Sequence, residues 1–88
     1  MKVYVVVEKT EETGAKDFDC TIFCTYQKAK EFLFEREKEL YKSYGVEQQL
    51  ARCYSAEYYP FVEDGSHSVH YFEQNDGYYL QIREMEVK

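Results

Sequence analysis

The clearest structural signal in this chain is the stretch from Thr25 to Gly45, TYQKAKEFLFEREKELYKSYG. Its apolar side chains recur at spacings of three, four and seven, which is the pattern of an amphipathic helix. Thr25 is a favourable N-cap and Gly45 a favourable stop, so we expect one helix over residues 26–44. The stripe that would face the core consists of Tyr26, Ala29, Leu33, Leu40 and Tyr44.

Two segments with a period of two precede this helix. KVYVVVE at residues 2–8 is rich in β-branched side chains, and FDCTIFCT at 18–25 alternates apolar and polar positions. The residues between them, 9–17, are polar around a glycine and predict a loop. We therefore expect two strands that form a hairpin, the first in the interior of the sheet because it is apolar on both faces.

The C-terminal part of the chain predicts a second hairpin. SVHYFE at 68–73 and YYLQIREMEV at 78–87 have strand patterns, and residues 75–77 (NDG) are a strong turn signal. Residues 63–66 predict another turn. The apolar phase changes near residues 83–84, which predicts a β-bulge there.

Residues 46–62 allow two interpretations. VEQQLARC would continue as a short second helix if Val46, Leu50 and Cys53 face inward, whereas YSAEYYPFV is more typical of an extended segment. A chain of 88 residues is long enough for one domain, over residues 1–88. We expect an α+β fold in the order β-β-α-β-β, with an antiparallel sheet of four to five strands and the main helix packed on one face.

The charge of the chain is negative and unevenly spread. Eleven Lys and Arg stand against 17 Asp and Glu, which gives a formal net charge of −6. From Cys53 to Ile82 there is no Lys or Arg, while five acids and six tyrosines lie in that stretch. Phosphate backbones are bound by basic clusters, so we expect no direct nucleic-acid binding and instead a partner with a basic protein surface. The apolar run at residues 3–7 is too short to predict a membrane span.

Tyrosines beside uncompensated acids supply flat contact area that ends in a hydroxyl group. Consecutive strand residues cannot both face the same core, so we expect two or three of these tyrosines to be exposed. The predicted partner-binding residues are Glu57, Tyr58, Tyr59, Glu63, Asp64, Glu73, Asp76, Tyr78 and Tyr79.

The cysteine, histidine and serine residues predict neither catalysis nor a metal or cofactor. Cys20 and Cys24 would lie about 13 Å apart on a strand, too far for a disulfide or a shared metal ion, so we expect core thiols. His67 and His70 would lie on opposite faces of a strand. The serines near them have no arrangement typical of a catalytic triad. Free thiols are typical of a cytoplasmic protein.

The opening KVYVVV, the segment IFCTYQKAKEFLFEREKEL and the ending YYLQIREMEVK carry a resemblance to small acidic proteins encoded by bacteriophages and mobile elements. Those proteins begin M-K-V-Y-V-V, and their helix starts at a Ser/Thr-x-x-K-A motif, here Thr25 to Ala29. Some small acidic phage proteins of this size, anti-CRISPR proteins among them, block defence nucleases at nucleic-acid sites. The resemblance implies an inhibitor in the cytoplasm of a bacterial host cell, and it carries over no functional residue.

Three hypotheses about function stay open. The first is a non-enzymatic inhibitor that docks on a basic surface, such as that of a host defence nuclease of the CRISPR type. The second is a binder of a small molecule such as a nucleotide signal, in which rings stack a base and Arg52, Arg83 and the helix lysines supply cations. The third is a homodimer formed through an edge strand.

Overall fold

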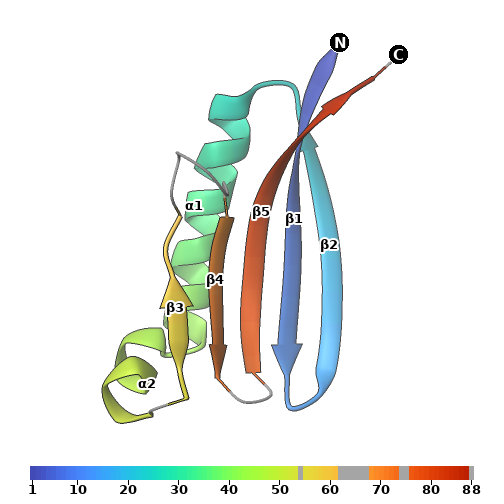
Figure 1. The fold of residues 1–88 in the computed structure, drawn as a ribbon. Helices are drawn as coiled ribbons and strands as arrows, with labels where there is room; N and C mark the ends of the chain where they lie inside the picture. Colours follow the sequence, from blue (N-terminus) through green and yellow to red (C-terminus); the bar gives the residue numbers. More distant parts are fainter. Residues whose placement is uncertain (54, 62–67, 74–75, 88) are drawn as a thin grey trace.

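The computed structural model describes residues 1–53, 55–61, 68–73 and 76–87. Five strands form one antiparallel sheet in the order β2-β1-β5-β4-β3, and both helices lie on one side of it (Figure 1). This confirms the predicted α+β fold with the main helix packed on the sheet. The elements are β1 (Lys2–Glu12), β2 (Ala15–Phe23), α1 (Tyr26–Ser43), α2 (Val46–Arg52), β3 (Glu57–Tyr59), β4 (Ser68–Glu73) and β5 (Asp76–Glu86).

The core lies between α1 and the sheet. Ala29, Leu33 and Leu40 of α1 are buried, as the apolar stripe predicted. The Lys28 amide donates to the Thr25 hydroxyl at 3.2 Å, and the chain leaves the helix at Gly45 with a positive φ of 60°. From the sheet, the core receives Val6, Val69, Tyr71, Tyr78, Leu80 and Ile82.

The first hairpin is longer than the sequence predicted. β1 continues to Glu12 and β2 begins at Ala15, so the expected loop at residues 9–17 is wrong. The turn is Thr13–Gly14, with φ values of 49° and 87°. Two consecutive positive φ angles are the requirement of a type I′ hairpin turn. Because threonine rarely adopts such an angle, Thr13-Gly14 is not one of the residue pairs, such as Asn-Gly or Asp-Gly, that signal this turn in a sequence.

The β-bulge expected in the last strand is wrong, whereas the extended segment expected within residues 54–62 is confirmed. β1 and β5 pair without interruption from Lys2 opposite Glu86 to Glu11 opposite Gly77, so the bulge predicted near residues 83–84 is wrong. The short strand expected near residues 54–62 is confirmed as β3. The predicted turn at 63–66 lies outside the described residues, as does Asn75 of the other turn.

The short helix α2 is confirmed, but its packing differs from the expectation. Val46 is fully buried, whereas Leu50, which was expected to face inward, is 41% exposed. Cys20 and Cys24 are exposed as well, so the expected core thiols are wrong. Within the described ranges, no helix is long and apolar enough to cross a membrane.

Candidate functional site

The sheet has one face under the helices and one face that no helix covers within the described residues (Figure 1). We call these the helix side and the open face. Directly paired residues of antiparallel strands point to the same face, and successive residues alternate. The open face therefore holds the odd residues of β1, β3 and β5 and the even residues of β2 and β4. Phe18, Ile22 and Tyr59 on this face are 64%, 67% and 54% exposed.

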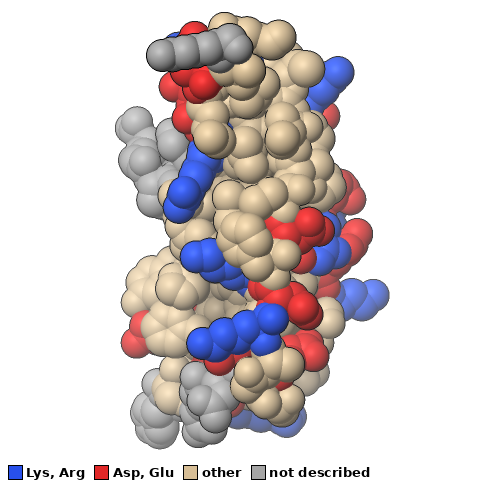
Figure 2. Space-filling view, turned by 90° about the vertical axis from the view of Figure 1, so that its right-hand side faces the viewer, with Lys and Arg blue, Asp and Glu red and all other residues tan. Residues whose placement is uncertain are grey.

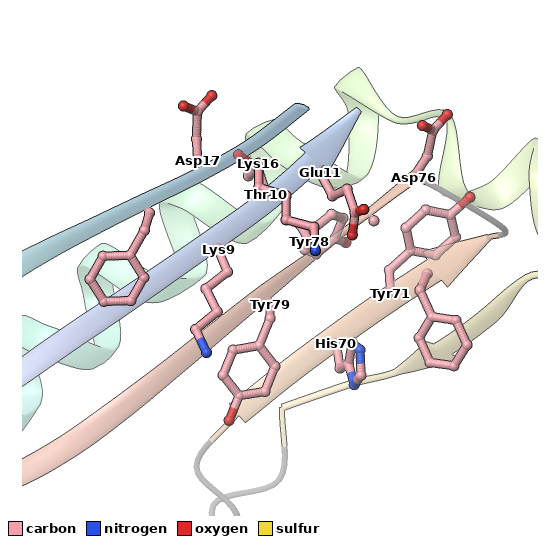
Figure 3. Close-up of a pocket in the computed structure, with 13 residues that line it drawn as sticks. Lys9, Thr10, Glu11, Lys16, Asp17, His70, Tyr71, Asp76, Tyr78 and Tyr79 are labelled. Carbon is pink, nitrogen blue, oxygen red and sulfur yellow. The ribbon is translucent and has the colours of Figure 1, made fainter. Parts of the chain in front are cut away.

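One row of side chains crosses all five strands on the open face. Phe18 is opposite Lys9, Lys9 is opposite Tyr79, Tyr79 is opposite His70, and His70 is opposite Tyr59. We call these five residues the aromatic row. Figure 3 shows Lys9, Tyr79 and His70 projecting from β1, β5 and β4 on the side away from the helices. Four rings and one ammonium group thus form a continuous band.

The members of the aromatic row touch their neighbours. The Lys9 Nζ lies 6.0 Å from the Phe18 ring centroid and 5.8 Å from that of Tyr79, within the range of cation–π attraction. The His70 ring meets the Tyr79 ring edge to face, with centroids 5.5 Å apart and an interplanar angle of 87°. The same imidazole lies 4.9 Å from Phe72 and 5.9 Å from Tyr59. These contacts hold the rings in fixed orientations.

A hollow of about 460 Å³ opens beside the aromatic row. Its floor is at Gly77, where a side chain would be only 2.5 Å from the Tyr71 carbonyl oxygen. Because glycine has no side chain, it leaves space at this position between the larger side chains of its neighbours. The open-face residues that line the hollow are Lys9, Glu11, Lys16, Phe18, His70, Phe72, Gly77 and Tyr79.

The two faces of the sheet differ in charge. The open-face positions of the strands carry the cations Lys9, Lys16 and Arg83 and the acids Glu11 and Glu57. The helix-side positions carry Lys2 and eight acids: Glu8, Glu12, Asp17, Asp19, Glu73, Asp76, Glu84 and Glu86. Figure 2 looks onto the β2 edge and shows blue side chains on the flank of the open face. Among the described strand positions, the negative charge thus lies on the helix side.

Burial lowers the pKa of His70 below its ordinary value, and the nearby Glu57 opposes this effect. The imidazole is therefore neutral at pH 7 and offers an aromatic surface rather than a charge. The lining of the hollow carries two cations, Lys9 and Lys16, and three acids, Glu11, Asp17 and Asp76, and of these acids only Glu11 lies at an open-face position.

The predicted partner-binding residues do not share one surface. Tyr59 and Glu57 lie on the open face, where the Tyr59 hydroxyl donates to Glu57 at 2.8 Å, and Tyr79 lies there too. Glu73 and Asp76 lie on the helix side. Glu63 and Asp64 lie outside the described residues.

Tyr58 and Tyr78 point to the helix side and donate from their hydroxyls to the two carboxylate oxygens of Glu37. Tyr78 is 2% exposed, so the expectation that it would be exposed is wrong. Burial and the Glu37 carboxylate raise the pKa of both tyrosines. These two rings therefore stabilise the fold rather than offer contact area.

A second hollow, of about 610 Å³, lies between α1 and the β1–β2 hairpin on the helix side. Glu8, Glu12, Asp17 and Asp19 line it, together with Arg36. Arg36 donates to both carboxylate oxygens of Glu8 at 2.7 Å, which leaves the remaining acids to set the local charge. We call this hollow the acidic groove.

The pKa of Tyr44, which lines the acidic groove, is affected by the negative charges there. Burial, together with Glu12 and Asp76, raises the pKa of its hydroxyl to about 12. Asp76 also accepts a hydrogen bond from the Thr13 amide at 2.7 Å, which fixes it at the end of the hairpin. The groove is therefore negative, and its acids come mainly from the first hairpin.

Sequence reasoning missed most residues of both hollows. Lys9, Lys16 and Phe18 belong to the segment that was expected to be a loop or its border, and Gly77 was assigned to a turn. Only the pairing register brings them beside Tyr79 and His70.

No protein-family description matches the chain, and neither the curated proteins nor the solved structures contain a significant match. Among the described residues, no group of three or more His, Cys, Asp or Glu could hold a metal ion.

Proposed function

We propose that this chain is a non-enzymatic binding protein whose open-face hollow takes a small molecule with a flat heteroaromatic ring and one anionic group. The observation that carries the proposal is the aromatic row, which sets Lys9 between two rings on an uncovered sheet face. The ligand class is that of a nucleotide signal carrying a single negative charge, such as a cyclic mononucleotide.

The ring of such a ligand has a surface on which to stack. Tyr79, His70 and Phe72 border the hollow, and their mutual contacts leave them little freedom to lose on binding. Stacking of one base on an aromatic side chain contributes about 1–3 kcal/mol. A volume of about 460 Å³ also lies within the usual range of ligand pockets, which runs from about 300 to 1,000 Å³.

The charge of the hollow selects the charge of the ligand. At the open-face positions of the lining, Lys9 and Lys16 stand against Glu11, which suits one phosphodiester, whereas Asp17 and Asp76 line the hollow from helix-side positions and oppose further negative charge. The field of the whole chain, at −6, opposes anions with several charges. We therefore expect a cyclic mononucleotide to bind better than the corresponding triphosphate.

Thermal unfolding with four adenine probes tests the proposal: 3′,5′-cyclic adenosine monophosphate, adenosine monophosphate, adenosine triphosphate and adenosine. A ligand at about 100 times its dissociation constant adds about 2.7 kcal/mol to the free energy of unfolding and raises the melting temperature. We expect the cyclic nucleotide to give the largest rise. The corresponding guanine series covers a different base edge. If neither cyclic nucleotide raises the melting temperature at millimolar concentration, the proposed ligand class is wrong.

Two variants and one matched control locate the binding site. Tyr79→Leu removes the stacking ring and Lys9→Gln removes the ammonium group, so we expect each to weaken binding about tenfold, a change of about 1.4 kcal/mol. Arg83→Gln removes a cation from the same face but outside the hollow, and should leave the affinity unchanged. Equal losses in Lys9→Gln and Arg83→Gln would mean that general charge, and not this hollow, attracts the ligand.

As a second function we propose inhibition of a nuclease of the CRISPR type through a basic nucleic-acid-binding surface. The acidic groove supports this proposal, because Asp17, Asp19 and Glu12 gather there and Asp76 adds to the field on Tyr44. Lysine and arginine side chains of a nucleic-acid channel are the chemical complement of such a groove. The resemblance to phage proteins is independent of this observation and stays a prediction.

A nuclease assay separates this second function from the first. Purified CRISPR nuclease is incubated with the chain before target DNA is added, and DNA cleavage is measured at low and high salt. We expect inhibition that weakens as salt rises and is lost in Asp17→Lys with Asp19→Lys, but persists in Tyr79→Leu. The charge reversal Glu63→Lys with Asp64→Lys tests the acids that the sequence alone favoured. Inhibition that survives both charge reversals would rule out an electrostatic contact through these acids.

A further inference from the structure

Strand β2 forms one edge of the sheet along nine residues, whereas the other edge, β3, has three (Figure 1). Among the described residues, no strand pairs with the outer row of backbone groups on β2. The Cys20 amide donates to the Asp19 carboxylate at 2.9 Å rather than to a neighbouring strand, so the even residues of β2 direct their amides outward. A long open edge is a template for another strand.

This edge also carries the two most exposed large apolar side chains of the strands, Phe18 and Ile22, at 64% and 67%. On the helix side, α1 contacts β2 as well as β1 and β5, and the Phe32 ring lies 5.2 Å from the ring of Phe23 at the end of β2, whereas the open face beside this edge carries no helix among the described residues (Figure 1). A partner that adds a strand here would cover the exposed apolar side chains Phe18 and Ile22 on the open face.

The positions of the charges disfavour two of the antiparallel registers in which a second copy of β2 can pair with the first. Centring the pair on Phe18 places Asp17 opposite the second copy's Asp19, and centring it on Asp19 places two aspartates face to face. Like charges directly opposite destabilise a strand pair. Centring the pair on Cys20 removes both conflicts, because Asp19 then lies opposite the second copy's Thr21.

We propose that two copies of this chain associate through β2, antiparallel and with Cys20 opposite Cys20, to form one continuous ten-stranded sheet. In this register Phe18 lies opposite the second copy's Ile22 on the open face, so each strand covers the most exposed apolar side chain of the other. Because Phe18 also lines the open-face hollow, the second copy's Ile22 would extend the wall of that hollow. The association does not depend on the ligand.

Thiol crosslinking tests the register. Outward-facing partners of an antiparallel pair have Cα atoms about 5.5 Å apart, which is within the range of about 4.4–6.8 Å that a disulfide spans. In the variant Cys24→Ser with Cys53→Ser, diamide should therefore oxidise two Cys20 thiols to an intermolecular disulfide while the diamide takes up the two electrons and two protons. Adding Cys20→Ser should abolish the covalent dimer. A covalent dimer that forms only in the variant that keeps Cys24, Cys20→Ser with Cys53→Ser, would overturn the proposed register.

Sedimentation equilibrium under reducing conditions tests the association itself. We expect the average mass of the wild type to rise toward that of a dimer between about 10 µM and 1 mM, and Ile22→Lys to raise the dissociation constant about tenfold or more, a change of at least about 1.4 kcal/mol. Leu50→Lys is the matched control, since it places the same charge at an exposed leucine of α2, away from β2. A mass that stays monomeric over this range, or a dimer that Ile22→Lys leaves unchanged, would overturn the proposal. Ligand binding by a monomer would still support the proposed function, so the two can fail separately.

Discussion

Replacing Gly77 by alanine tests the close approach of strands β4 and β5 beneath the hollow. A Cβ atom at this position would lie 2.5 Å from the Tyr71 carbonyl oxygen, 2.9 Å from the Phe72 Cα and 3.0 Å from the Phe72 Cβ. The first two of these atoms belong to the backbone of a paired strand, so they cannot turn away as a flexible side chain could. The substitution must therefore displace one strand from the other.

Two opposing effects set the magnitude for Gly77→Ala. Glycine within a strand costs roughly 0.5–1 kcal/mol relative to alanine, and the substitution would recover that amount. Overpacking of a close-packed region costs about 1–3 kcal/mol, and contact with backbone places this site at the upper end. We expect a net loss of about 2 kcal/mol. In a domain of this size each kcal/mol corresponds to about 4–8 °C in melting temperature.

The assay is urea unfolding of Gly77→Ala beside the matched control Gly14→Ala. A side chain at Gly14 would meet nothing within 4 Å, but its φ of 87° disfavours any residue other than glycine. The control therefore measures backbone strain without overlap, and we expect it to lose less stability than Gly77→Ala. If Gly77→Ala is as stable as the wild type, the β4 backbone does not approach this position as described, and the floor of the hollow is not fixed by glycine.

Three further predictions concern the helix side. Glu37→Leu leaves the Tyr58 and Tyr78 hydroxyls without their acceptor and should cost about 1–3 kcal/mol in urea unfolding, whereas a neutral effect would show that water replaces the carboxylate. Both tyrosines have a pKa raised above 10 in the fold, so each hydroxyl holds its proton more tightly in the folded than in the unfolded state. The stability that they contribute should be complete below pH 10 and decline as pH rises above it. A free energy of unfolding, followed by circular dichroism, that stays constant at alkaline pH would contradict this. Thr25→Ala removes the N-cap hydrogen bond of α1 and should cost about 1 kcal/mol, with Thr25→Ser retaining most of the stability in the same thermal assay.

The sequence was sufficient for the elements whose burial is one-sided. The helix α1 has one apolar stripe and one charged face, so its period of 3.6 and both of its ends could be recognised. In β5 the same reasoning failed. Met85 and Val87 are out of phase with Leu80 and Ile82, and for this reason a β-bulge was predicted near residues 83–84. The register is unbroken, and Met85 lies on the open face, which holds exposed apolar side chains such as Phe18 and Ile22 beside its charged residues.

The wrong prediction for the cysteines and the missed hollow have the same cause. An alternating strand has two faces, and the sequence does not say which one a helix will cover. Cys20 was assigned to the core because it shares a phase with Phe18 and Ile22, yet that phase is the open face. The hollow could not be predicted either, since it depends on a register that brings Lys9 opposite both Phe18 and Tyr79.

The distribution of charge shows why a count along the chain misjudged the binding surface. The stretch from Cys53 to Ile82 has acids and no Lys or Arg, and for that reason Arg52, Arg83 and the helix lysines were expected to supply the cations of a ligand site there. In the sheet, however, β5 has β1 as its neighbour, and Lys9 comes from a segment seventy residues earlier in the chain than Tyr79. Neighbours across strands matter more to a surface field than neighbours in sequence, because a paired residue is about 5 Å away whereas the next residue points to the opposite face. Strand alternation then separates the acids of the helix side from the lysines of the open face, so one small domain presents two surfaces of different charge. Each calls for a different kind of partner, so we expect Lys9→Gln to weaken nucleotide binding, and Asp17→Lys with Asp19→Lys to abolish nuclease inhibition.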